Sequence, residues 1–234
     1  MALDPSQFII TRKRKKYRFA LFANASNCFE LADWLTYVHE GQSFMQGLVT
    51  VEVGAGTGLF LVELAERHPE RRYIALDVKA DRLQKGARLA IERGMTNIWF
   101  VRARADQLLE VVPEHSVSEI WLTFSDPFPR ASDAKRRLTA PRFLDLYHRA
   151  LVPNAHLPIG SDPIASAVRM KTDSRALFDW SLEQLVTQGW RITELSYDLH
   201  ASDLPDEYKI LTTYERKWQA EGLTTHYLSA RFSK

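Results

Sequence analysis

The sequence has little of several features that would define its class. It contains one cysteine, Cys28, among 234 residues, which excludes a disulfide framework and a zinc site built from several cysteines. No apolar run approaches the ~18–20 residues that a membrane-spanning helix requires. Near the N-terminus the basic residues follow the apolar ones, which is the reverse of a secretory signal. We therefore expect a soluble, cytoplasmic protein with no membrane partner.

The composition is that of a folded globular protein. Hydrophobic residues make up 45% of the chain and charged residues 26%, which excludes disordered and fibrous classes. The histidines are scattered without metal-ligand spacing, so we expect no metal. Nothing in the sequence decides between a monomer and a homodimer.

The formal net charge of +2 hides an uneven distribution. Residues 1–18 hold six basic side chains against Asp4, a local net charge of +5 that leaves about −3 for the rest of the chain. A basic segment on a mildly acidic body suggests a polyanionic partner. A solvated surface strand or a disordered tail would explain the same charges equally well.

From residue 50 onward, short β-branched runs alternate with helical patterns. We predict strands over 50–53, 72–76, 98–101, 119–124, 168–171, 191–197 and 225–232. The predicted helices span 59–67, 80–93, 141–150 and 174–188. This alternation is typical of βαβ units in an α/β fold with a mostly parallel sheet. We predict one domain over residues 48–234, preceded by a basic extension and lead-in helix over 1–47.

A glycine-rich turn follows the first predicted strand and precedes a helix. Its glycines are Gly54, Gly56 and Gly58. A dinucleotide fingerprint would place its third glycine at position 59, which is Leu59, and no Gly-Lys-Ser/Thr follows to make a P-loop. Three glycines in this position allow a ligand to approach the backbone closely. A simple tight turn is the structural alternative.

Carboxylates lie near the ends of three successive predicted strands. They are Glu52, Asp77 and Asp106. Acids here suit a cationic nucleoside with free ribose hydroxyls and would repel a pyrophosphate. S-adenosylmethionine has these properties, and the arrangement resembles the class I methyltransferase fold. That resemblance implies a Rossmann-like, seven-stranded, mostly parallel sheet with helices on both faces.

Three further motifs follow in order along the chain. An acid–proline turn, Asp126-Pro127, ends the fourth predicted strand and is followed by the basic run Lys135 to Arg137. Lys171-Thr172-Asp173 ends the fifth strand, and Thr212-Thr213-Tyr214-Glu215 lies downstream. With these motifs the sequence, from about residue 48 onward, resembles the bacterial tRNA (guanine-N7-)-methyltransferase family.

The resemblance implies methyl transfer from S-adenosylmethionine to N7 of a guanosine in tRNA, in the variable loop. The implied cofactor-binding residues are Glu52, Gly54, Gly56, Gly58, Asp77, Asp106 and Asp126. Asp126 would lie nearest the chemistry, as the catalytic residue. The implied substrate-binding residues are Arg130, Asp173, Thr212, Thr213, Tyr214 and Glu215. The implied RNA-binding residues are Lys135, Arg136 and Arg137, and the N-terminal segment would add Arg12, Lys13, Arg14, Lys15 and Lys16.

The sequence departs from the family pattern in two places. Relative to the family pattern, the loop Arg130 to Asp133 has fewer basic residues and an added acid, which motivates an alternative reading as a methyltransferase of the same fold acting on a small purine- or pteridine-like heterocycle. An RNA-binding protein without catalysis is a third reading, but the retained acids oppose it. Residues 154–164 replace a short turn, so that Asp162 competes with Asp173 as the substrate-facing acid. We prefer Asp173, because the residues after it continue the family pattern.

Overall fold

The protein is described by a computed structural model that covers residues 13–40, 48–153, 166–212, 215 and 222–232. The chain divides into two compact units, Met1–Val111 and Val112–Lys234. The division falls inside the segment 48–234 that the sequence predicts to be one domain.

The described residues of the first unit form four strands and several helices. Its elements are α1 (Lys13–Ala23), β1 (Cys28–Glu30), α2 (Leu31–Glu40), β2 (Val49–Val53), α3 (Leu59–Arg67), β3 (Arg72–Asp77), α4 (Ala80–Glu92), β4 (Ile98–Arg102), η2 (Ala105–Gln107) and α5 (Leu108–Val111). The strand order is β1-β4-β3-β2, and all three pairs are parallel. Every residue of β2 is buried, as expected for a strand inside a parallel sheet.

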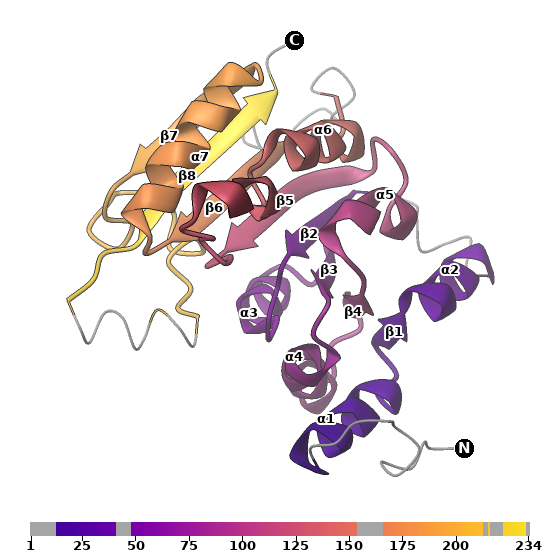
Figure 1. Cartoon of the computed structure of the whole chain (residues 1–234). Coiled ribbons are helices and arrows are strands. Elements are labelled where there is room, and N and C mark those ends of the chain that lie inside the picture. The colour runs from indigo at the N-terminus through magenta and orange to yellow at the C-terminus, as the bar shows by residue number, and fades with distance from the viewer. Residues whose placement is uncertain (1–12, 41–47, 154–165, 213–214, 216–221, 233–234) are drawn as a thin grey trace. The chain divides into compact units, whose positions relative to one another are not determined.

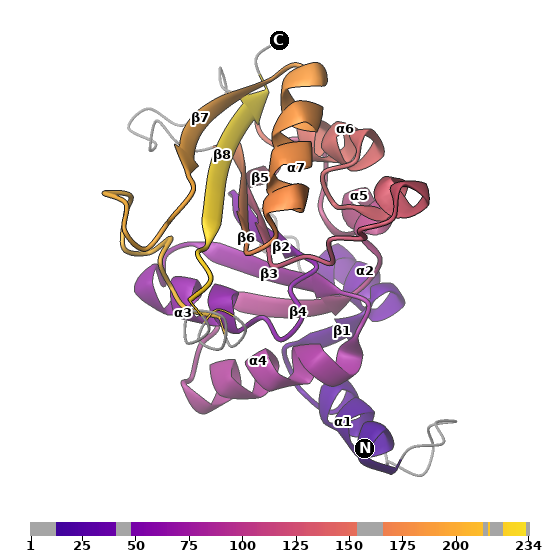
Figure 2. The same ribbon diagram turned by 60° about the vertical axis from the view of Figure 1, so that its left-hand side comes forward.

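Helix α1 packs along α4, as both views show (Figures 1 and 2). The apolar face of α1 is buried through Ala20 and Phe22, while Lys15 and Tyr17 face solvent. Part of the basic segment is therefore an amphipathic helix whose apolar side belongs to the core of the first unit. A strand or a disordered tail does not describe Lys13–Ala23.

In its described residues, the second unit is a mixed sheet accompanied by the helices α6 and α7. Its elements are β5 (Val117–Thr123), η3 (Ala131–Arg136), α6 (Pro141–Ala150), β6 (Ala167–Thr172), α7 (Arg175–Thr187), β7 (Trp190–Ser196) and β8 (His226–Phe232). The strand order is β5-β6-β8-β7: β5 and β6 run parallel, and β8 is antiparallel to both of its neighbours. Helix α7 packs on this sheet (Figure 2). It begins where the Ser174 side chain accepts the N–H of Leu177 at 3.3 Å, an N-cap.

The predicted α/β class with a mostly parallel sheet is confirmed. The residues described form eight strands, one more than the seven predicted. The additional strand is β1, which has three residues and lies in the predicted extension. A segment this short carries too little alternation to be recognised, and its pairing with β4 defines it. Among the described residues, no helix is both long enough and apolar enough to cross a bilayer.

Candidate functional site

The glycine-rich turn connects the end of β2 to α3 in the first unit. The N–H groups of Gly54 and Ala55 both donate to the carbonyl of Leu76, at 2.8 and 3.0 Å, which ties the turn to the end of β3. Gly54, Gly56 and Gly58 have φ values of 75°, 56° and 66°. This left-handed backbone is strained for residues with a Cβ atom, so the turn depends on glycine.

The glycines of this turn differ in what surrounds them. A Cβ atom on Gly58 would lie 2.7 Å from the ring of Phe100, so Gly58 allows close packing against β4. A Cβ atom on Gly56 would meet nothing within 4 Å. The backbone of Gly56 therefore faces a space that a side chain would fill and that a ligand can approach.

Asp77 ends β3 and joins the turn to the start of α4. Its Oδ2 accepts the N–H of Gly56 at 2.8 Å, and its Oδ1 accepts the N–H of Lys79 at 2.8 Å. These two bonds fix the carboxylate in one orientation. Because each carboxylate oxygen has two lone pairs, both oxygens retain capacity to accept further hydrogen bonds.

The other predicted cofactor acids of the first unit have contrasting surroundings. Glu52, in β2, is only 1% exposed. Asp106 lies in η2, where its two oxygens accept the Nε and a terminal N–H of Arg104 at 2.8 and 2.5 Å. Asp106 also raises the pKa of the Arg104 guanidinium through this hydrogen bond and its charge. Asp106 is thus already paired with a cation that the sequence reasoning did not consider.

The acid–proline turn follows β5 in the second unit. Asp126 is exposed there, between Phe124 and Phe128, whose φ values are 48° and 41°. Positive φ is a genuine outlier for a bulky residue and persists only where the surroundings enforce it. One such contact is the N–H of Phe124, which donates to the carbonyl of Lys171 at 2.8 Å.

The basic residues after this turn do not share one environment. Arg130 and Lys135 are exposed, and Arg136 is also exposed while its guanidinium lies 4.3 Å from the Phe128 ring centroid. Arg137 is less exposed, and its guanidinium donates to the carbonyls of Pro127 and Phe128. Two of these three basic side chains are therefore exposed, although Arg136 also lies over Phe128 and pairs with Asp133 at 3.5 Å. Arg137 is the one that is hydrogen-bonded to the backbone of the turn.

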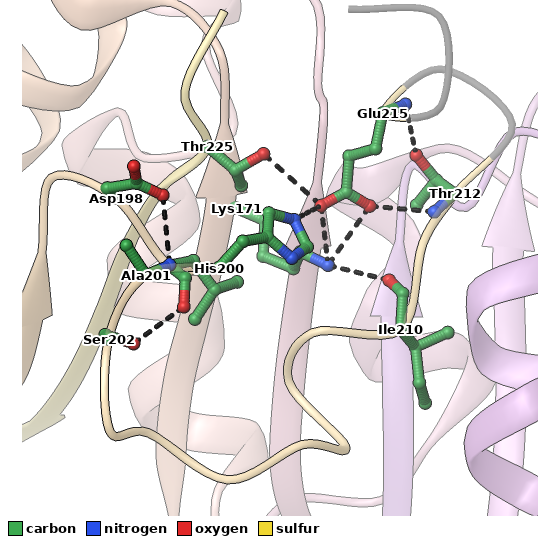
Figure 3. A network of polar contacts seen from close by, with 10 residues as sticks. Lys171, Asp198, His200, Ala201, Ser202, Ile210, Thr212, Glu215 and Thr225 are labelled. Atoms are coloured by element: carbon green, nitrogen blue, oxygen red, sulfur yellow. Dashed lines mark hydrogen bonds and ion pairs between the residues drawn. The ribbon is translucent and has the colours of Figure 1, made fainter. Parts of the chain in front are cut away.

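The end of β6 carries a buried ion pair that sequence reasoning missed. The Lys171 ammonium lies 3.0 Å from one oxygen of Glu215 and also donates to the carbonyl of Ile210 at 2.9 Å (Figure 3). Both charged side chains are fully buried. A lysine within the predicted strand 168–171 was the available sequence signal, because a lysine that becomes buried requires a partner.

The Glu215 carboxylate also contacts other polar groups around this ion pair. It accepts the N–H of Thr212 at 2.7 Å and the hydroxyl of Thr225 at 3.4 Å, and His200 Nε2 lies 3.2 Å away (Figure 3). Thr212 Oγ1 in turn accepts the N–H of Glu215 at 3.1 Å. Thr212 and Glu215, predicted to contact the guanosine, are thus buried around Lys171. Asp173 lies two residues beyond that lysine, half-buried between the end of β6 and the N-cap of α7.

Several predicted site residues lie outside the described part of the chain. These are Arg12, Thr213, Tyr214 and the whole of segment 154–164 with Asp162. Lys13 and Arg14 belong to α1. In the ranges that the structure covers, no group of three or more His, Cys, Asp or Glu residues could hold a metal ion.

Comparison with solved structures defines the class. The 16S rRNA methyltransferase KamB has a TM-score of 0.61 with 16% identity, over 84% of this chain and 94% of its own. A 16S rRNA (adenine(1408)-N(1))-methyltransferase from Catenulisporales acidiphilia has a TM-score of 0.58 with 14% identity, over 84% and 93%. With the glycine turn and Asp77, the fold is that of a class I methyltransferase, and the family model "Putative methyltransferase" matches residues 46–228.

Sequence relatives then define the family. A tRNA (guanine-N(7)-)-methyltransferase of Cytophaga hutchinsonii is 40% identical over 187 residues, which are 79% of this chain and 80% of the relative. The Brevibacillus brevis protein of the same name is 34% identical over 182 residues, 78% and 79% of the two chains. The chain belongs to the tRNA (guanine-N7-)-methyltransferase family.

Proposed function

We propose that the protein transfers a methyl group from S-adenosylmethionine to N7 of a guanosine in the variable loop of tRNA. The observation that carries this proposal is the 40% identity to a relative of that name over about four fifths of both chains. The glycine turn and Asp77 support it independently, since both suit a nucleoside cofactor. The small-heterocycle alternative is not favoured, because relatives at 31–40% identity carry the tRNA name.

The residues of the first unit fit S-adenosylmethionine, which supplies an electrophilic methyl group on a sulfonium. The open space at Gly56 lets the cofactor approach the backbone. Asp77 would accept the ribose hydroxyls, with its orientation already fixed by Gly56 and Lys79. The negative charge of Glu52, Asp77 and Asp106 suits a ligand with a sulfonium and an ammonium group. Asp106 would then bind the cofactor while Asp106 itself remains hydrogen-bonded to Arg104.

The chemistry that we propose for the second unit depends on aligning the guanine with the methyl group and on stabilising positive charge, more than on proton transfer. Guanine N7 has an unprotonated lone pair, so no general base is needed to expose it. The enzyme's residues must hold N7 in line with the methyl carbon, which lowers the barrier through orientation. The purine becomes cationic as the bond forms, and carboxylates at Asp126 and Asp173 would stabilise that charge. They would also accept the guanine amino and imino N–H groups, which adenine lacks in this arrangement.

The proposed RNA contacts rest on exposed basic side chains. Lys15 on α1, with Lys135 and Arg136 on η3, face solvent and would bind backbone phosphates. Phosphate contacts release counterions, so tRNA affinity should fall steeply as the salt concentration rises.

The experiment is incubation with radiolabelled S-adenosylmethionine and an unmodified tRNA transcript, followed by nucleoside analysis. The expected product is labelled 7-methylguanosine. A matched transcript with adenosine in place of the variable-loop guanosine should give none. Cofactor binding without transfer to any transcript would refute the proposal, and transfer to both transcripts would refute the assigned position.

A further inference from the structure

Arg137 contacts the acid–proline turn through two backbone carbonyls. Its Nε donates to the carbonyl of Pro127 at 3.1 Å, and a terminal N–H donates to the carbonyl of Phe128 at 3.0 Å. The planar guanidinium forms this fork in one fixed geometry, which a lysine ammonium does not reproduce. The two carbonyls directly follow Asp126 in the chain.

The same guanidinium also contacts α7. It lies 4.5 Å from the ring centroid of Trp180, within cation–π range. Two residues beyond Arg137, the buried hydroxyls of Thr139 and Ser181 are 2.6 Å apart and join the same segment to α7. Arg137 thus connects the acid–proline turn to a helix that begins just after Asp173.

The turn itself requires such support. Phe124 and Phe128 both hold positive φ values, a strained backbone for bulky residues that surrounding contacts must offset. The carbonyl of Lys171 holds the N-terminal side of the turn through Phe124. On the C-terminal side, Arg137 makes the corresponding contact at Phe128.

We propose that Arg137 is a positioning residue: its guanidinium holds the acid–proline turn against Trp180 of α7 and so fixes Asp126, and it does not bind RNA phosphate. This inference rests on the proposed function, in which Asp126 stabilises the methylated guanine. It separates Arg137 from Lys135 and Arg136, although the three are adjacent in sequence. Those two neighbours remain the candidates for phosphate contact, because both are exposed.

The test compares Arg137→Ala and Arg137→Lys with Lys135→Ala and with Arg149→Ala. Arg149 is a matched control, an arginine of α6 whose guanidinium is bonded to the exposed Glu114. Each variant is assayed for kcat, for KM of tRNA and for tRNA binding at several salt concentrations. Thermal unfolding shows whether each variant is folded.

For Arg137→Ala we expect kcat to fall about 10- to 100-fold, because a displacement of about 1 Å at the reacting groups has this effect. The tRNA dissociation constant and its salt dependence should stay within about twofold of wild type. Arg137→Lys should restore little of the lost kcat, because one ammonium cannot form the fork. Lys135→Ala should instead weaken tRNA binding and reduce the slope of log affinity against log salt by about 0.7 to 0.9.

A second variant tests the contact with α7. Trp180→Leu should also lower kcat. Combining it with Arg137→Ala should cause little further loss, because both substitutions remove the same contact between Arg137 and Trp180. Weaker tRNA binding with a reduced salt slope for Arg137→Ala would overturn the proposal, as would an unchanged kcat. A loss of thermal stability with normal kcat would assign Arg137 a purely structural role and would also overturn it. If the wild-type protein methylates no transcript, the proposed function fails instead.

Discussion

Removing the carboxylate of Glu215 should destabilise the protein strongly. Glu215→Ala leaves the Lys171 ammonium fully buried with the Ile210 carbonyl as a remaining partner, and it deprives the N–H of Thr212 of its acceptor. Breaking a buried ion pair by removing one partner costs about 3–5 kcal/mol, because the other charge stays desolvated. A chain of this length loses roughly 2–4 °C of melting temperature per kcal/mol, so the expected shift is roughly 6–20 °C.

The assay is thermal and urea unfolding of the wild type beside three variants. Glu183→Ala, at an exposed position of α7, is the matched control and should stay within about 0.5 kcal/mol of wild type. The double variant Lys171→Met/Glu215→Gln removes both charges while keeping an acceptor for Thr212. It should be more stable than Glu215→Ala, since neutral groups carry a much smaller desolvation penalty.

Two results would refute this reasoning. A melting temperature for Glu215→Ala within about 2 °C of wild type would mean that the buried charge is compensated by water or by rearrangement. A double variant at least as unstable as Glu215→Ala would mean that packing, and not charge pairing, dominates at this position.

Three further predictions concern Asp77, the glycine-rich turn and helix α1. Asp77→Ala should weaken S-adenosylmethionine binding by at least about tenfold, measured calorimetrically, because a fixed charged acceptor is lost; unchanged affinity would exclude Asp77 from the site. Gly58→Ala should destabilise the protein more than Gly94→Ala, although both positions have nearly the same positive φ, because an added Cβ meets an aromatic ring at Gly58 and open space at Gly94. Equal losses would mean that the ring moves aside easily. Lys15→Gln should weaken tRNA binding without changing cofactor affinity, and an unaltered salt dependence would remove α1 from the RNA surface.

Much of the fold was predictable because its signals are local. The predicted helix over 59–67 and the predicted helix over 141–150 match α3 and α6 at both ends. Gly58 precedes the first of these helices and Pro141 begins the second, so the sequence itself indicates where each helix starts. The strand β1 was not predictable, since three residues acquire their identity only by pairing with β4.

The environment of the candidate site residues was less predictable, because it depends on contacts between distant parts of the chain. Lys171 and Glu215 are 44 residues apart, and no periodicity connects them. Arg137 resembles its basic neighbours in sequence, and only the path of η3 turns its side chain toward the preceding turn. The residue types at these positions therefore indicated their chemistry. The direction in which each side chain points could be determined only from the three-dimensional structure.

Arg137 recognises the acid–proline turn through main-chain carbonyls, and this has an evolutionary consequence. A carbonyl is present whatever the side chain, so the residues around the contact are free to drift while the contact persists. We expect such drift at Arg130 to Asp133, the loop in which the sequence departs from the expected basic pattern. We expect homologues to vary most in this loop and to retain both an arginine at position 137 and a flat aromatic surface at position 180.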